Sequence, residues 1–185
     1  MGDPRFPRKR YKTPPHPWEA ERIEAEKELE RKYGLKNKRE IWKAKAYLER
    51  FRRQSMNLTA RIRTGDTQAE KERDWLLRKM NRLGLLEEGA QLTDILSLSV
   101  ENVLNRRLQT LVYLKGLASS SRQARQIIVH GHIAINGRRV TLPGYIVPIE
   151  EEHHITYYPY SPLADELHPV RPKARSRAQE EEEVQ

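Results

Sequence analysis

Residues 119–140 read SSSRQARQIIVHGHIAINGRRV and contain signals for a helix, its end and a β-hairpin. Ser120 followed by Gln123 is a capping-box pattern, which predicts a helix from Ser121 to Gly131. Asn136-Gly137 is the strongest short hairpin signal, because both residues of a type I′ turn need positive φ. A two-residue turn there would pair 135 with 138, 134 with 139 and 133 with 140. We therefore expect a helix packed on a small antiparallel sheet.

The residues on either side extend this module. From Val100, with Ser99 as its cap, apolar residues at helical spacing predict one helix that runs to Gly116. Its opposite side would carry polar residues, including Gln109. After a Pro143-Gly144 turn, residues 145–149 are expected to form a strand, and HHITYYPYSP (153–162) contains one more.

The charge pattern of this region is one-sided. Residues 102–149 contain seven Arg or Lys and no Asp or Glu, although the whole chain has 26 acidic residues. On the predicted helix after Ser120, Arg122 and Arg125 point away from the apolar side, so we expect both to face solvent. Replacing both with Ala is expected to weaken RNA binding without unfolding the protein. The alternative interpretation, a merely solvated surface, predicts acids interspersed with the bases. We therefore interpret the region as a module that presents cations to a polyanion, which requires that no distant carboxylate pairs with them.

Three charged amphipathic helices are predicted upstream. The first runs from Pro17-Trp18 to Tyr33, with Trp18, Ala25, Leu29 and Tyr33 as its apolar stripe and Gly34 as its end. The second covers about 38–55, with a stripe of Ile41, Ala44, Leu48 and Phe51. The third is capped by Asp66 or Thr67 and reaches Arg82. Residues 91–98 are read as a connection.

The ends of the chain differ from its middle. Residues 1–17 are Pro-rich and basic, which predicts an extended arm that orders on RNA, although a plain disordered terminus is the alternative. The cations of this arm are Arg5, Arg8, Lys9, Arg10 and Lys12. Residues 161–185 are rich in Pro and charge and predict an extended or disordered tail. The expected domains are thus the arm at 1–17, a helical domain at 18–101, a small RNA-binding domain at 102–160 and the tail.

Composition narrows the function further. A net charge of +9 indicates an anionic partner, nucleic acid before a membrane surface. With 37% hydrophobic and 33% charged residues, a large buried catalytic cleft is not expected. The absence of Cys excludes a thiolate zinc site and is typical of a protein inside the cell. No apolar run reaches the roughly 20 residues of a membrane span.

The histidines and serines of the region do not form a recognisable catalytic or metal motif. His130, His132, His153 and His154 would need three or four converging ligands to hold zinc, and no metal or cofactor is expected. His130 is instead expected to end its helix, where a positive charge is favourable. Ser119–Ser121 lack a G-x-S-x-G setting, so capping explains them better than nucleophilic attack.

The two helices around Gly116, the basic second helix, HGHIAING and the following RRV together resemble the small RNA-binding fold named after small-subunit ribosomal protein four. The upstream LSVENVLNRRLQTLVYLKGLA and the charged helical half resemble that ribosomal family in its archaeal and eukaryotic form. Four cysteines that bind zinc in many bacterial relatives have no counterpart here, so no metal role transfers. The fold class expected is α+β: a helical N-terminal portion beside a small domain of two helices and a short antiparallel sheet.

The resemblance implies a structural, non-enzymatic protein of the cytoplasmic small ribosomal subunit. It would bind small-subunit rRNA directly, early in the assembly of the part of the subunit called the body. It would also adjoin the small-subunit protein of the fifth family. That contact would influence decoding accuracy near the channel by which messenger RNA, a further partner, enters the subunit. RNA contacts are expected at Arg106, Arg107, Lys115, Arg122, Arg125, His130, Arg138 and Arg139. The N-terminus of the helix after Ser120 would add a phosphate seat. The alternatives are a free-standing assembly or heat-shock RNA-binding factor, and a part of an RNA-modifying enzyme.

Overall fold

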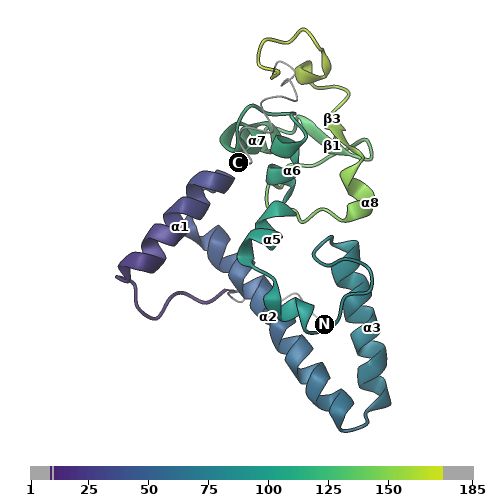
Figure 1. Cartoon of the computed structure of the whole chain (residues 1–185). Helices are drawn as coiled ribbons and strands as arrows, with labels where there is room; N and C mark the ends of the chain where they lie inside the picture. Colours follow the sequence, from purple (N-terminus) through teal and green to yellow (C-terminus); the bar gives the residue numbers. More distant parts are fainter. Residues whose placement is uncertain (1–8, 10, 173–185) are drawn as a thin grey trace, which may run out of the picture.

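The computed structural model of this protein describes residue 9 and residues 11–172, and its fold class is α+β as predicted. A helical part and a small module with a three-stranded sheet lie beside each other (Figure 1). The helices and strands in order are α1 Ala20–Tyr33, α2 Lys38–Arg63, α3 Thr67–Arg82, α4 Asp94–Ser97, α5 Val100–Asn105, α6 Leu108–Leu114, α7 Ser121–Val129, β1 Ile133–Ile135, β2 Arg138–Arg139, α8 Ile149–Glu152 and β3 Ile155–Tyr157, followed by a 3-10 turn, η1, at Pro162–Ala164.

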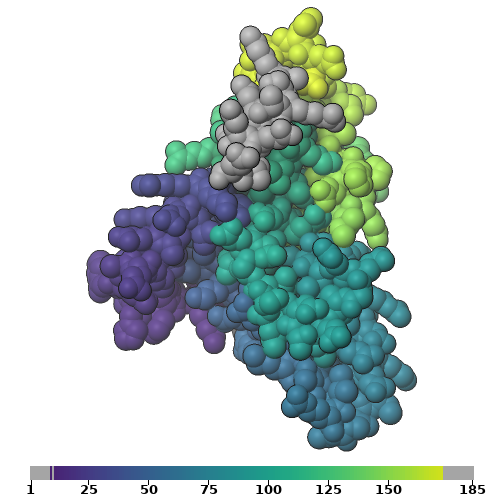
Figure 2. All heavy atoms as spheres, viewed as in Figure 1, coloured from purple at the N-terminus to yellow at the C-terminus, as the bar shows by residue number. Residues whose placement is uncertain are grey.

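The helix α2 is the central helix of the helical part and contacts α1, α3, α4 and α5. Its predicted stripe of Ile41, Ala44, Leu48 and Phe51 is buried, which confirms the helical periodicity. The helix runs to Arg63 and not to 55, because the same face continues through buried Ser55 and Leu58. Its partner α3 returns antiparallel to it, so the end of this helical hairpin and the small module lie at opposite ends of the molecule (Figures 1 and 2).

The helix α1 differs from its prediction in the face that it buries. Trp18 precedes the helix and is 91% exposed, and Ala25 is exposed as well, so the predicted stripe is wrong at both positions. The side that faces α2 carries Glu26, whose carboxylate accepts hydrogen bonds from Trp42 Nε1 and Arg22 Nη1, each at 2.9 Å. The buried side of α1 therefore contains an acid that is satisfied by two donors. The spacing of apolar residues does not predict such a position.

The helix expected from Val100 to Gly116 is broken at Arg106 and Arg107. Arg107 has extended backbone angles, φ −75° and ψ 142°, and α6 starts after it. The cause is a distant segment: Leu108 N donates to Tyr145 O at 2.7 Å, and Val147 N donates to Arg106 O at 3.0 Å. These bonds take the backbone groups that a continuous helix would use. The strand expected at 145–149 is consequently reduced to one bridge, Arg107 to Ile146, followed by α8.

The hairpin and the last strand confirm their predictions. Asn136 and Gly137 have φ of 51° and 75°, as a type I′ turn requires, and the register pairs 134 with 139 and 135 with 138. The strand β3 pairs antiparallel with the other edge of β1, which gives the order β2-β1-β3. The predicted caps are present too: Asp66 accepts from Gln68 N, Ser99 from Asn102 N and Ser120 from Gln123 N.

Two hydrophobic cores meet at the break between α5 and α6. One contains buried side chains from Tyr33 to Leu104, and the other contains those from Leu108 to Leu163. Residues 161 and 163, at the start of the expected tail, are buried against the small sheet. The rest of the tail beyond residue 172 and arm residues Arg5, Arg8 and Arg10 lie outside the described part, while Lys9 and Lys12 are exposed.

Candidate nucleic-acid interface

Three of the cations predicted to face RNA are bound to carboxylates of the chain itself. Arg107 Nη2 lies 2.9 Å from a Glu40 oxygen, and Arg125 Nη2 lies 2.7 Å from the other. Arg106 Nη1 lies 2.6 Å from Glu152. The side chains of the three arginines keep only 9–22% of their exposure. The expectation that Arg122 and Arg125 face solvent together is therefore wrong for Arg125.

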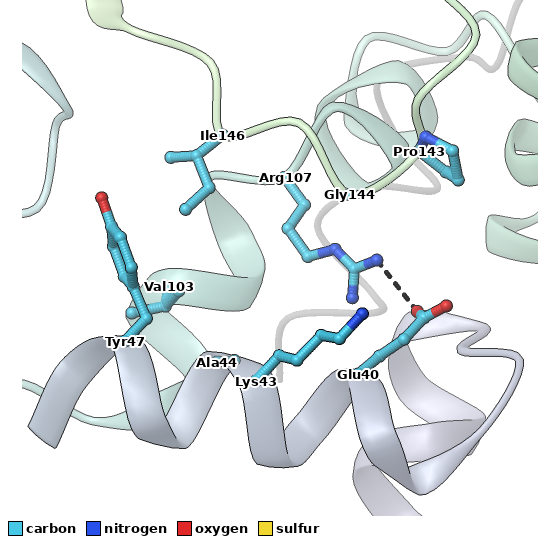
Figure 3. Close-up of a pocket in the computed structure, with 9 residues that line it drawn as sticks. All are labelled: Glu40, Lys43, Ala44, Tyr47, Val103, Arg107, Pro143, Gly144 and Ile146. Carbon is cyan, nitrogen blue, oxygen red and sulfur yellow. Dashed lines mark hydrogen bonds and ion pairs between the residues drawn. The ribbon is translucent and has the colours of Figure 1, made fainter. Parts of the chain in front are cut away.

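Glu40 explains this correction. It lies in the first turn of α2, where one of its oxygens meets Arg107 at the break before α6 (Figure 3) and the other meets Arg125 of α7. Burial alone would raise the pKa of the Glu40 carboxyl, but the hydrogen bond from Arg125 and the charge and hydrogen bond of Arg107 outweigh burial and leave the pKa below its ordinary value of 4.5. A carboxylate shared by two guanidinium groups joins the helical part to both helices of the small module.

Gln109 completes this junction. The sequence places it on the polar side of its helix, yet it is 1% exposed. Its Nε2 lies within hydrogen-bond distance of three carbonyl oxygens: Tyr33 at 3.0 Å, Gly34 at 2.9 Å and Ser121 at 2.9 Å. Its Oε1 accepts from Arg125 Nη1 at 3.3 Å. One amide thus ties the end of α1 to the start of α7.

The close approach of α1 also covers the expected phosphate seat. A Cβ added at Gly34 would lie 2.6 Å from Ser121 Oγ and 3.0 Å from Arg122 N. Ser120 Oγ accepts from Gln123 N at 3.2 Å. The first turn of α7 is therefore packed and capped by the chain itself, and the expectation of an open anion site there is not met.

The remaining cations do lie on the surface. Arg122, Arg138, Arg139 and His130 are exposed, and none of them takes part in an ion pair among the described residues. Arg139 is held against the end of α7, because its Cδ lies 2.9 Å from the position of a Cβ at Gly131. Exposed Lys115 donates to the carbonyl oxygen of Glu152.

The histidines have structural contacts. His132 Nδ1 lies 2.7 Å from Ser161 Oγ, which ties the end of α7 to the segment after β3. Burial lowers the pKa of His132, and the charges of His130 and His168 lower it further. In the part of the chain that the structure describes, no three His, Asp or Glu side chains gather as a metal site would need.

The family follows from comparison with known proteins. Residues 106–153 match the S4 domain. The chain is 52% identical to small ribosomal subunit protein uS4 of Thermoplasma acidophilum over 184 residues, which is all of this chain and 92% of the relative. It is 55% identical to the protein of the same name from Methanococcus aeolicus, over 92% of this chain and 96% of the relative.

The chain belongs to the uS4 family of small ribosomal subunit proteins. The uS4 protein of Picrophilus torridus, 51% identical, aligns over 99% of this chain and its own full length, so the resemblance holds for the helical part as well. The S4 domain begins at Arg106, where α5 ends, and closes just after α8. Over 9 and 11–172, none of the helices has the length and apolar character to cross a bilayer.

Sequence reasoning missed Glu40 as a site residue. It lies 67 residues from Arg107 and 85 residues from Arg125, and no local pattern connects it with either. One signal was available, and only for Arg107, which lies three residues after Leu104 and four before Leu111 and so beside the apolar stripe of its predicted helix. An arginine at such a position needs a carboxylate partner if it becomes buried.

Proposed function

We propose that the chain binds small-subunit rRNA directly, through the exposed cations of its S4 domain. The observation that carries this proposal is that Arg122, Arg138 and Arg139 are exposed and take part in no ion pair among the described residues. The relatives of this chain are small ribosomal subunit proteins. Exposed Lys115 lies on the same module and adds to its charge, and exposed His130 lies there as well. Arg106, Arg107 and Arg125 are assigned to the fold and not to RNA contact.

Arginine suits this role for two physical reasons. Its planar fork donates two hydrogen bonds to one phosphate, and its face can stack on an exposed base. An A-form RNA helix hides its base edges in a deep groove, so folded RNA is recognised mainly through phosphates, 2′-hydroxyls and shape. The exposed Arg122 on α7 and Arg138 and Arg139 on the hairpin can present such forks to RNA.

The junction gives the proposed mechanism its second part. Because Glu40 and Gln109 tie the helical part to the S4 domain, RNA segments that contact both parts would be held at a fixed angle. In the cytoplasmic small subunit this would support early assembly of the body. Contact with the fifth-family protein, and an effect on decoding accuracy where messenger RNA enters, belong to the same proposal. The mechanism is binding and not catalysis.

The arm and the domain division are part of the proposal. Lys9 and Lys12 are exposed, and with Arg5, Arg8 and Arg10 they would follow the RNA backbone. We retain the division into arm (1–17), helical domain (18–101), small domain (102–160) and tail (161–185), with one change: residues 161 and 163 are buried against the small sheet and belong with the small domain. The two separate hydrophobic cores support a division into two domains close to the boundary at 101.

A salt titration tests the RNA contacts. Replacing Arg122, Arg138 and Arg139 together by Ala should make the slope of log affinity against log salt less negative by about 2–3, since each lost phosphate contact removes about 0.7–0.9. The matched control replaces three exposed cations of the α2–α3 hairpin that take part in no ion pair among the described residues, Arg53, Arg63 and Lys71. Binding to a transcript of small-subunit rRNA is measured by filter retention. An unchanged slope in the first variant, with its circular dichroism intact, contradicts the proposed contacts.

The competing function is a free-standing RNA-binding assembly or heat-shock factor. Sedimentation separates the two, because a ribosomal protein remains with the small subunit after a high-salt wash, whereas a factor dissociates. Recovery of the chain only in the soluble fraction would favour the factor.

A further inference from the structure

A cavity of about 320 Å³ opens where α2 faces the segment 143–146 (Figure 3). One wall is apolar and is formed by Tyr47, Val103 and Ile146. The other end carries Lys43 and Arg107. Small-molecule sites commonly have volumes of about 300–1,000 Å³, so this cavity has room for one base or nucleotide but not for a stretch of folded chain.

The charge of the cavity is not balanced. Glu40 supplies its carboxylate, and both oxygens of Glu40 are already bound, one to Arg125 and one to Arg107. Lys43 is exposed and has no ion pair among the described residues. Arg50 lies seven residues, about two turns, after Lys43 on the same helix and is exposed. The opening therefore favours an anionic group.

The aromatic wall is rigid. The Tyr47 ring meets Phe51 edge to face, with centroids 4.7 Å apart and planes at 88°. Phe51 is itself buried in the helical core, so Tyr47 cannot easily turn away. On the opposite rim, Gly144 has no side chain. A Cβ there would lie 3.3 Å from Arg107 Nη2, so glycine leaves the space beside this guanidinium free.

We propose that this cavity receives one unpaired nucleotide of the rRNA, with its base against Tyr47 and its phosphate at Lys43. The inference rests on the proposed function and adds a site to it where α2 faces the S4 domain, at residues other than Arg122, Arg138 and Arg139. Stacking on an aromatic ring is the usual way in which proteins hold a splayed-out base. An acidic side chain of a neighbouring protein would satisfy Lys43 but would leave the aromatic wall uncovered, so we favour the nucleotide.

Paired variants of the full-length chain test this site. Tyr47→Ala should weaken binding to a small-subunit rRNA transcript roughly tenfold, the effect expected of one lost base stack, with an unchanged salt slope. Tyr47→Phe keeps the ring and should bind like the wild type. Lys43→Ala should make the salt slope less negative by about 0.7–0.9. Lys45→Ala removes the same charge from another face of α2 and is the control.

Ultraviolet crosslinking followed by mass spectrometry locates the contact directly. The expected result is a nucleotide adduct on the α2 peptide that contains Lys43 and Tyr47. If wild type binds the transcript, the S4-domain arginine variant binds less tightly, and both Lys43→Ala and Tyr47→Ala bind like the wild type, the cavity does not hold RNA although the proposed function stands. A protein crosslink at the cavity in intact subunits, without a nucleotide adduct, also overturns the site. Failure of the wild type to bind rRNA contradicts the proposed function itself.

Discussion

Replacing Glu40 by Ala should destabilise the whole chain, because it leaves two guanidinium groups without their shared carboxylate. The side chain of Glu40 is 16% exposed, and its oxygens lie 2.7 Å from Arg125 and 2.9 Å from Arg107. Removing one partner of a buried ion pair typically costs about 3–5 kcal/mol. Since Arg125 keeps 22% of its exposure and can turn partly to water, we expect a loss of about 2–4 kcal/mol in the free energy of unfolding.

Urea unfolding followed by circular dichroism measures this loss. The matched control is Glu21→Ala, which removes an exposed acid of α1 that has no ion pair in the described part and should change the stability by less than about 0.5 kcal/mol. A double-mutant cycle of Glu40→Ala with Arg107→Ala should give a coupling energy of about 1–3 kcal/mol. If Glu40→Ala costs no more than Glu21→Ala, Arg107 and Arg125 are not held by Glu40, and their assignment to the fold is wrong.

Three further predictions follow from the same contacts. Gly34→Ala should cost about 2–3 kcal/mol, because its φ is +59° and the new Cβ would lie 2.6 Å from Ser121 Oγ, whereas Gly65→Ala, with φ +83° and open space, should cost about 1 kcal/mol in the same urea titration. Ser120→Ala removes the cap of α7 and should lower the free energy of unfolding by about 1 kcal/mol. The pKa of Glu40 is lowered in the fold, so its stabilising effect is complete above its ordinary value of 4.5 and is lost as the pH falls below that value. In urea titrations, the free energy of unfolding should therefore fall more between pH 7 and pH 3 for the wild type than for Glu40→Gln. An equal fall in both proteins would count against the ion pairs.

The amino-acid sequence alone determined those parts of the local structure whose signals lie close together in the chain. The buried face of α2, the caps at Ser99 and Ser120 and the hairpin register at Asn136-Gly137 were all predicted correctly. Each depends on residues within a few positions of one another, through the helical period, a side-chain bond to a nearby N–H, or the sign of φ. Such signals are complete within the segment that carries them.

Only the tertiary structure decided which cations remain available. Residues 102–149 contain no acid, yet Arg107 and Arg125 are bound by Glu40 from 67 and 85 residues away, and Arg106 is bound by Glu152 just beyond the region. The break before α6 has the same origin, because the backbone of 145–147 takes the hydrogen bonds of 106 and 108. Charge partners and broken helices are set by contacts between distant segments, and a one-dimensional pattern does not contain those contacts.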